Sequence, residues 1–344
     1  MKEAQVAKGG AVTIVDSPVP TPAAGQVLIK VEVSGSNPKD WKVPEWTDKT
    51  HNSGDDIAGT VVSVGAGVVD FKAGDRVAAF HEMVKPHGSF AEYAVAWDYT
   101  TFHLGDNVSY EDAATIPLVG LTAAVSLYTD LGLPQPWTPA PEGTVTPLVV
   151  YGAGSAVGAA AIQLARLGNI HPIFAVAGQS APFVESLLDK SKGDVVVDYR
   201  GGDEAAVKAL KAAVGDHKVR HVVNAISEGG SNYIVSTVLQ LDGRIATVLP
   251  WNAEDDKRIG RQVDNVRTSV GRVHADLKDL GFVYSKFFAR ALAAGTLKGH
   301  PYVVVPGGLA GVQGALQNLR DGKAHGVKYV FRIAETEGAG QNKL

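Results

Sequence analysis

The sequence predicts an α/β protein in which a β-rich N-terminal module precedes a parallel sheet covered by helices on both faces. Short runs in the first 105 residues alternate apolar and polar side chains, as half-buried strands do. From about residue 148, apolar strand-like runs alternate with helical segments of 10–15 residues. This second pattern is typical of βαβ units in a doubly wound sheet.

In the first half, strands are expected at 26–35, twice within 57–80, and at 88–97. Short strands at this spacing favour a compact, barrel-like module. Ser109, with Asp112 three residues later, predicts the N-terminus of a helix. A Pro-rich loop is expected at 133–147.

The second half alternates between the two element types. Strands are expected at 148–152, 172–177, 194–199, 221–226 and 243–249, with helices at 156–168, 181–190, 203–213 and 231–240. The polar segment 252–272 has no regular pattern and could be a loop or an excursion. A helix within 280–297 and strands at 300–305 and 327–333 complete the chain.

Composition excludes several classes of function. The 344 residues contain no cysteine, which excludes disulfides, thiolate nucleophiles and cysteine-based zinc sites. The formal net charge of −4 gives no reason to expect a nucleic-acid partner. We see neither a spanning segment of about 18 apolar residues nor the apolar core of a signal peptide. No membrane association and a cytoplasmic location are therefore expected.

The junction after Tyr151 carries the clearest chemical signal. The stretch "GAGSAVGAAAIQLARLG" (152–168) places a tight turn of small residues between a strand and a helix. Exposed N–H groups and the helix dipole make such a turn an anion site, where a dinucleotide's pyrophosphate binds in a βαβ unit. The spacing of Gly152, Gly154 and Gly158 departs from the usual G-x-G-x-x-G. We expect phosphate contacts from these three and from Ser155, Ala156 and Val157.

An acidic residue that normally follows this turn is missing. NAD sites place Asp or Glu about 20 residues later to hold the adenosine ribose. Here no acidic residue occurs from Ala159 through Val184, and the second strand ends in "AVAGQSA". A neutral turn at Gln179 and Ser180 leaves room for a 2′-phosphate, so NADPH is the expected cofactor. Tyr199 is a candidate to stack on the adenine; Lys190, Lys192 and Arg200 are candidate phosphate partners.

Three further segments, "NPKDWK" (37–42), "GTVVSVGAGVVDFKAGDRV" (59–77) and "GSFAEYAV", complete a resemblance that covers about residues 5 to 334. The chain resembles the medium-chain dehydrogenase/reductase superfamily, in particular its zinc-free quinone oxidoreductase (zeta-crystallin) branch. It is also similar to fungal zinc-binding-dehydrogenase-like reductases and to trans-acting enoyl reductases of polyketide pathways. The resemblance implies a GroES-like catalytic domain, a β-barrel made of residues 1–118 and 275–344. A Rossmann cofactor domain would occupy residues 119–274.

The resemblance also implies that no metal is bound. The zinc-dependent branch holds its metal through a Cys at the position of Asn37 and a His at the position of Asp55. An amide and a carboxylate without any thiolate are a poor zinc site. We therefore expect a zinc-independent enzyme that polarises its substrate by hydrogen bonds alone.

The same resemblance assigns roles to individual residues. Asn37, Asp40 and Lys42 are catalytic candidates, with Asn37 as an amide donor to a substrate carbonyl and Lys42 as a donor to ribose or an enolate. Asp40 could instead cap a helix that starts at Trp41. Leu118 and Thr122 are expected to line the substrate cleft. The remaining cofactor contacts are expected from Lys39, Trp41, Leu249, Pro250, Phe282, Ala324 and His325.

The expected function is NADPH-dependent hydride transfer to an activated C=C or C=O bond of a small molecule such as a quinone, enone, aldehyde or diketone. One alternative is a trans-acting enoyl reductase, whose substrate is bound to a carrier protein. Another is a non-catalytic, crystallin-like protein that binds NADPH. A homodimer joined through the "GRIATVL" strand (243–249) as a sheet edge is a further expectation.

Overall fold

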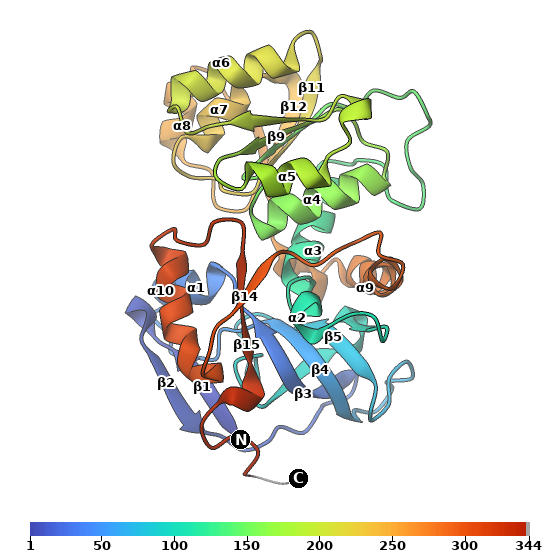
Figure 1. Ribbon diagram of the computed structural model, residues 1–344, viewed down its shortest axis with the longest axis vertical. Helices are drawn as coiled ribbons and strands as arrows, with labels where there is room; N and C mark the ends of the chain where they lie inside the picture. The colour runs from blue at the N-terminus through green and yellow to red at the C-terminus, as the bar shows by residue number, and fades with distance from the viewer. Residues whose placement is uncertain (342–344) are drawn as a thin grey trace. The chain divides into compact units, whose positions relative to one another are not determined.

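The computed structural model describes residues 1–341 and divides into two compact units. The first contains Met1–Leu121 together with the C-terminal segment from Gly271, and the second is Thr122–Val270. These limits lie near the domain boundaries expected at residues 118 and 275. Figure 1 shows the elements of both units.

The first unit is built on a seven-stranded sheet with the order β14-β15-β3-β4-β5-β7, in which β6 also pairs with β3. Its strands are β3 (Gln26–Gly35), β4 (Asp56–Val64), β5 (Arg76–Phe80), β6 (Tyr93–Trp97), β7 (Thr101–His103), β14 (Tyr302–Val304) and β15 (Lys328–Arg332). The pairs are antiparallel except for β14 and β15. The strands expected at 26–35, 57–80 and 88–97 are therefore confirmed.

Strand β3 joins the two ends of the chain. Its first half, from Gln26 to Lys30, pairs with β6, and its last residues pair with β15. At that end Gly35 lies opposite both Val330 of β15 and Asp56 of β4. The C-terminal strand is thus placed beside residues that come 295 to 299 positions earlier.

Several elements of the first unit were not predicted from the sequence. A two-stranded ribbon is formed by β1 (Lys2–Val6) and β2 (Val12–Asp16), and a helix, α10, spans Val312–Arg320. The other helices are α1 (Lys39–Thr47), α2 (Tyr110–Ala113), α3 (Pro117–Ala124) and α9 (Lys278–Ala293). Ser109 caps α2 as predicted, since its Oγ accepts the N–H of Asp112 at 3.0 Å.

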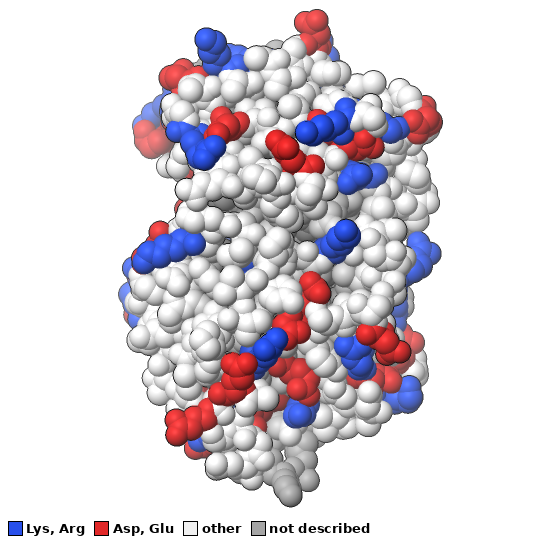
Figure 2. Space-filling model, in the orientation of Figure 1, with Lys and Arg blue, Asp and Glu red and all other residues white. Residues whose placement is uncertain are grey.

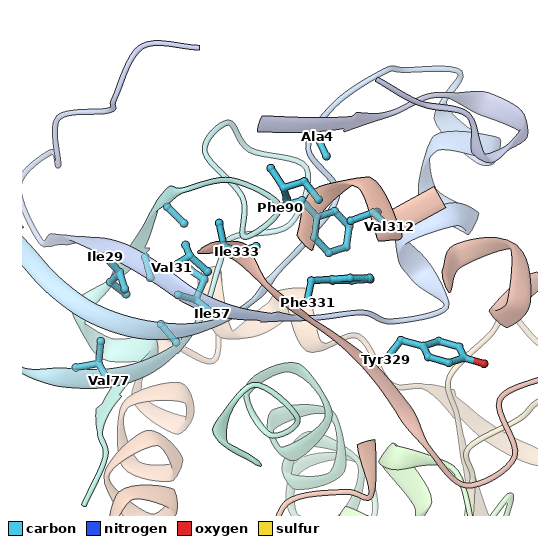
Figure 3. Close-up of a cluster of buried hydrophobic side chains, with 14 of the residues drawn as sticks. Ala4, Ile29, Val31, Ile57, Val77, Phe90, Val312, Tyr329, Phe331 and Ile333 are labelled. Carbon is cyan, nitrogen blue, oxygen red and sulfur yellow. The ribbon is translucent and has the colours of Figure 1, made fainter. Parts of the chain in front are cut away.

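One hydrophobic core of the first unit contains an aromatic pair among mostly aliphatic side chains. Phe90 and Phe331 meet edge to face, with ring centroids 5.6 Å apart. Figure 3 shows both rings in a cluster that includes Ile57, Val312 and Tyr329. Tyr329 and Phe331 therefore fix which face of β15 points into this core, because side chains alternate along a strand.

The second unit is a six-stranded parallel sheet. Its strands are β8 (Leu148–Tyr151), β9 (Ile173–Ala177), β10 (Val195–Asp198), β11 (Val219–Asn224), β12 (Leu239–Thr247) and β13 (Asp264–Arg267). Their spatial order is β10-β9-β8-β11-β12-β13, with every pair parallel. Numbered along the chain, this is the order 3-2-1-4-5-6 of dinucleotide-binding sheets.

Helices cover both faces of this sheet (Figure 1). Helices α4 (Ala156–Leu167) and α5 (Ala181–Leu187) pack together on one face, and α6 (Asp203–Val214) packs with α7 (Ser231–Ser236) on the other. Beneath α6 and α7 lies an apolar core that includes Val149, Phe174 and Ile245. The predicted alternation of strands and helices is confirmed, although α5 and α7 end earlier than expected.

One segment of this unit whose form was left open proves regular, and one sequence prediction is wrong. Segment 252–272 contains a helix, α8 (Ala253–Ile259), and the sixth strand, β13. Because β13 pairs with β12, the "GRIATVL" strand is not an edge of the sheet. The outer strands are β10 and β13, and the dimer proposed through "GRIATVL" loses its structural basis.

One helical segment contradicts an expectation about membrane-spanning composition. The helical segment Tyr110–Asp130, which ends in the π-helix η3 (Val125–Asp130), is long and apolar enough by composition to cross a membrane. Inside the protein, 89% of its apolar window is buried. The expectation that no segment has the length and composition of a membrane span is therefore wrong. Its burial identifies this segment as a core helix.

Gly158 is a direct test of how closely α4 approaches β8. A Cβ atom at Gly158 would overlap the carbonyl oxygen of Gly152 and lie 2.9 Å from the Cα of Ala153. We expect Gly158→Ala to lower the free energy of unfolding by about 1–3 kcal/mol, measured by urea denaturation, because the backbone must move apart.

The matched control is Gly314→Ala in α10, where a Cβ would meet no atom within 4 Å. That change should raise the free energy of unfolding by about 0.5–1 kcal/mol through helix propensity. Equal effects of the two alanines would contradict the close approach.

Candidate active site

The glycine-rich turn between β8 and α4 has the geometry of a phosphate site. Gly152 has a φ of +72°, which favours glycine, and Ser155 caps α4 by accepting the N–H of Gly158 at 3.1 Å. The first N–H groups of a helix have no partner within it and face outward with the positive end of its dipole. Gly152, Gly154 and Ser155 form the turn, Ala156, Val157 and Gly158 begin α4, and their phosphate contacts stay a prediction.

Ser180 lies directly against this turn. A Cβ atom at Gly154 would overlap the hydroxyl of Ser180, which places the end of β9 beside the start of α4. The turn Gly178–Gln179–Ser180 carries no acidic side chain, and Gln179 is exposed. The neutral surroundings expected at the second strand are therefore present.

Tyr199 and Arg200 follow β10 at the same carboxyl edge of the sheet. Tyr199 is 42% exposed, and a Cβ at Gly178 would lie 2.9 Å from its ring. Arg200 pairs with Asp198, which lowers the pKa of that carboxyl to about 2. Tyr199 is therefore partly exposed beside the end of β9, and its contact with adenine stays a prediction.

Lys190 and Lys192 do not reach this edge. They form the turn η4 (Lys190–Lys192) just before β10, and the start of a parallel strand lies at the opposite edge from its end. Lys192 is bound to Glu142 of the Pro-rich loop, and Lys190 lies 3.6 Å from Glu185. Of the three candidate phosphate partners, only Arg200 is at the edge where the turn lies.

The switch point of the sheet lies between β8 and β11, where the strand order reverses. A Cβ at Gly152 would lie 2.5 Å from the side chain of Ile226, which follows β11. Ser227, at a φ of +61°, accepts the N–H of Val248 at 2.9 Å, and this places the end of β12 beside the end of β11. Ligands of open α/β sheets bind in this kind of crevice.

Sequence reasoning named two residues at this crevice and missed two. Leu249 is half-buried and Pro250 is exposed in the segment after β12. Ile226 and Ser227 were not predicted. The sequence could have indicated both residues. "HVVNAI" was expected to be a strand, and the end of that strand must lie beside the glycine-rich turn.

In the first unit, Asn37 lies in a buried polar network. Its Nδ2 donates to Oδ2 of Asp56 at 2.7 Å, and its Oδ1 accepts from the ammonium of Lys328 at 3.1 Å. Lys328 Nζ also lies 2.5 Å from Asp56 Oδ2, and Asp56 Oδ1 accepts the N–H of Leu118 at 2.7 Å. The network thus connects the predicted catalytic Asn37 with the predicted cleft residue Leu118.

Neither Asp56 nor Lys328 was predicted to belong to the site. Both side chains are almost fully buried, with 0% and 3% of their surface exposed. Breaking a buried pair of this kind by removing one partner costs about 3–5 kcal/mol. Burial and the charge of Lys328 also lower the pKa of His300, to about 4.

A second buried cluster surrounds Lys39. Its ammonium contacts the carboxylates of Asp55 and Asp40 and the carbonyl of Ser53. Burial opposes the charge, but the two carboxylates outweigh it and raise the pKa of Lys39. Lys39, expected at the cofactor, is therefore engaged inside the first unit.

Asp55 is held from two sides. Besides Lys39, the ring Nδ1 of His81 lies 2.8 Å from Asp55 Oδ1. Burial would raise the pKa of Asp55, but the charge of Lys39 and the hydrogen bond with His81 lower it overall. Within residues 1–341, no three histidine, aspartate or glutamate side chains are grouped so that they could hold a metal ion.

Asp40 has a structural position, and its predicted cap register is wrong. Helix α1 starts at Lys39, with Pro38 as the N-cap, so Asp40 lies inside the first turn. From there its Oδ2 accepts the backbone N–H of Asn37 at 2.7 Å. Burial raises the pKa of Asp40 to about 7, and its side chain is fully buried.

The remaining predicted residues of the first unit, and Thr122 at the start of the second, are dispersed. Trp41 lies between two cations, with the side chains of Lys42 and Arg320 each 5.4 Å from its ring centroid. Ala324 packs against the core of the unit, whereas His325 is exposed in the loop before β15. Phe282 is 43% exposed on α9 beside Lys286. Thr122 is buried one turn after Leu118 on α3.

Known proteins match both units. The model of the alcohol dehydrogenase GroES-like domain matches residues 23–109. The chain is 47% identical over 310 residues to trans-enoyl reductase fsr4 of Gibberella fujikuroi, covering 89% of this chain and 91% of that protein. The chain belongs to the medium-chain dehydrogenase/reductase superfamily.

Two further comparisons agree. Trans-enoyl reductase ACTTS2 of Alternaria alternata is 32% identical over 344 residues, with 94% of this chain and 96% of that protein covered. The crystal structure of CurK enoyl reductase has the same fold, with a TM-score of 0.77 at 20% identity, over 96% of this chain and 98% of that one. The predicted superfamily and fold class, a GroES-like domain with a Rossmann domain, are thereby confirmed.

The chain is accordingly an oxidoreductase that uses a nicotinamide cofactor, as predicted. Of the predicted functions, the trans-acting enoyl reductase matches these relatives directly, and the broader activated-bond reductase is compatible with them. The non-catalytic alternative is not supported.

His300 gives the site a pH dependence that can be measured. An unfolded histidine takes up a proton below pH 6.5, whereas His300 in the folded protein does so only near pH 4. Its contribution to stability is therefore complete above pH 6.5 and is lost as the pH falls towards 4. Relative to His300→Asn, the wild type should lose about 3 kcal/mol over that interval.

The measurement is urea denaturation of both proteins at several pH values between 7 and 4. Using the difference between them removes the contribution of every other titrating group. A difference that stays constant with pH would show that His300 is not held neutral by its surroundings.

Proposed function

We propose that the protein is an NADPH-dependent, trans-acting enoyl reductase that saturates the double bond of an α,β-unsaturated thioester. The observation that carries this proposal is 47% identity over 89% of the chain to a protein named as a trans-enoyl reductase. A thioester carried by another protein is the substrate that a separate, trans-acting enzyme would receive.

The choice of NADPH rests on charge at the end of β9. The turn Gly178–Gln179–Ser180 offers hydroxyl and amide groups where a carboxylate would repel a 2′-phosphate. Arg200 lies at the same edge, although it is paired with Asp198. Exchange of that carboxylate for a phosphate would let the guanidinium keep a charged partner.

The glycine-rich turn and the switch-point crevice would hold the cofactor. Gly152, Gly154 and Ser155 would approach its pyrophosphate, and Ile226 and Leu249 lie at the crevice beside them. When bound, the reduced nicotinamide would supply a hydride for the β carbon, and solvent would supply a proton for the α carbon. The protein's part is to orient the double bond and to stabilise the charge that develops on the thioester oxygen.

Asn37 is the proposed donor to that oxygen. An amide nitrogen carries two hydrogens, and Asp56 accepts one of them. The second would donate to the thioester carbonyl. Asp40 is less suited to this role, because its carboxylate is used by Lys39 and by the start of α1.

A carrier-protein partner is part of the proposal, and its docking surface is not assigned. On the face drawn in Figure 2, basic and acidic side chains are interspersed, and no large patch of one sign is visible. A stand-alone reductase of quinones, enones or carbonyls remains the second candidate, since the same hydride chemistry would serve it.

The test is NADPH oxidation at 340 nm with purified protein. The acceptors are crotonyl-N-acetylcysteamine, the same acyl group on a phosphopantetheinylated carrier domain, a quinone and an aromatic aldehyde. We expect turnover of both thioesters, with a kcat/KM at least tenfold higher for the carrier-bound form, and a preference of at least tenfold for NADPH over NADH.

Two variants of Gln179 test the choice of cofactor separately from the choice of substrate. Gln179→Asp should raise the KM for NADPH at least tenfold by repulsion of the 2′-phosphate, whereas Gln179→Asn should change it little. Reduction of the quinone or aldehyde alone would favour the second candidate, and equal use of NADH would contradict the NADPH assignment.

A further inference from the structure

The network around Asn37 is assembled by strand order. Strands β15, β3 and β4 are neighbours in the sheet, and Gly35 lies opposite both Val330 and Asp56. Asn37 follows two residues after Gly35, and Lys328 lies two residues before Val330. Three segments from distant parts of the sequence therefore present one side chain each to the same place.

Alternation along β15 directs Lys328 away from the hydrophobic core. Tyr329 and Phe331 point into that core (Figure 3), so Lys328 points to the other face of the strand. Gly35 leaves room there, since a Cβ at its position would lie 3.0 Å from Cε of Lys328. The ammonium thus reaches Asn37 and Asp56 in a buried position.

These partners leave the Asn37 amide only one orientation. An ammonium can only donate, so it must face the amide oxygen. An ionised carboxylate can only accept, so it must face the amide nitrogen. Reversing the amide would place Nδ2 against the ammonium of Lys328 and Oδ1 against Asp56, and both hydrogen bonds would be lost.

The charge of Lys328 also changes what the amide can do. A hydrogen bond from a cation to the amide oxygen polarises the group and makes its N–H hydrogens stronger donors. The Asp56 carboxylate compensates the buried charge and, through the N–H of Leu118, ties the start of α3 to the same network.

We propose that Lys328 and Asp56 are positioning residues for the reaction: they orient and polarise the Asn37 amide so that its second N–H hydrogen binds the thioester oxygen as negative charge develops there. This rests on the proposed function. A structural role alone explains the pair poorly, since well-packed apolar residues stabilise a protein as well as a buried ion pair does.

The test is a mutant cycle on the holoenzyme with NADPH and crotonyl-N-acetylcysteamine. The four proteins are the wild type, Asn37→Ala, the double variant Lys328→Met/Asp56→Asn, and all three changes together. Asn37→Ala and the double variant should each lower kcat at least 30-fold, with the Kd for NADPH changed less than threefold. The combined protein should be no more than about threefold slower than the slower of these, because the residues act as one unit.

A kinetic readout distinguishes positioning from folding. The kinetic isotope effect with NADPH deuterated at the transferred hydrogen should increase in the double variant, because the chemical step becomes slower. The proposal would be overturned if the loss of kcat in the combined protein equalled the product of the losses in Asn37→Ala and in the double variant. A double variant with wild-type kcat would also overturn it.

Matched variants control for charge and stability. Lys72→Met/Asp75→Asn removes a lysine–aspartate pair of the same unit whose lysine is exposed, with atoms 2.8 Å apart, and should leave kcat unchanged. If the double variant does not fold, the kcat of Lys328→Arg tests the positioning role instead. This variant should keep the charge yet misplace the contact to Oδ1, which lowers kcat about fivefold at an unchanged thermal midpoint, and an unaltered kcat would overturn the proposal.

The two proposals fail differently. A wild-type protein that does not reduce any thioester overturns the proposed function and the positioning role with it. An active wild type with independent effects of Asn37 and the Lys328–Asp56 pair overturns the positioning role alone.

Discussion

The buried contact of Lys328 with Asp56 and Asn37 is the interaction on which the site in the first unit depends. Lys328 is 291 residues from Asn37 and 272 from Asp56, so the contact exists only if the C-terminal strand returns beside β3. The sheet order provides this return, and the aromatic core beneath β15 fixes its register. If the register of β15 shifted by one residue, Lys328 would point into that core. Tyr329 and Phe331 would then point to the opposite face of the sheet.

The adjacent carboxylates of Asp55 and Asp56 bind different cationic or hydrogen-bonding partners near Asn37. Asp56 binds Lys328, and Asp55 binds Lys39 and His81. Both carboxylates come from the motif "GDDIAG", where the zinc-dependent branch that the chain resembles carries its metal-binding His. In this protein, the side chains around that motif form two hydrogen-bonded ion pairs. Positive charge near Asn37 thus comes from lysine side chains that the fold itself holds in place.

The cofactor unit could be predicted largely from the sequence, because its signals are local. The strand and helix periods, the small residues of 152–158 and the missing acid are all visible within short segments. Strand β13 was missed because "DNVR" is short and polar, and only pairing with β12 makes it a strand. Lys190 and Lys192 were plausible by distance along the chain, but the direction of a parallel strand places them at the wrong edge.

The first unit was harder to predict, because its site is assembled from segments that are far apart. Asn37 and Asp40 were named from their motif, yet Asp40 proved to be an anchor of α1. Lys328 lies three residues after His325, which was named instead. Nothing in "AHGVKYV" indicates which side chain is buried, since alternation on a strand gives two possible faces and only the packed core selects one.

The most direct measurement is a ¹⁵N–¹H NMR spectrum of the lysine side chains, with lysine labelled at Nζ. A buried ammonium held by a carboxylate and an amide oxygen exchanges its hydrogens slowly with water, so Lys328 should give a visible, protected signal. That signal should shift in Asn37→Ala and disappear in Asp56→Asn. A spectrum in which Lys328 exchanges like the exposed lysines, or is indifferent to Asp56, would contradict this account of the site.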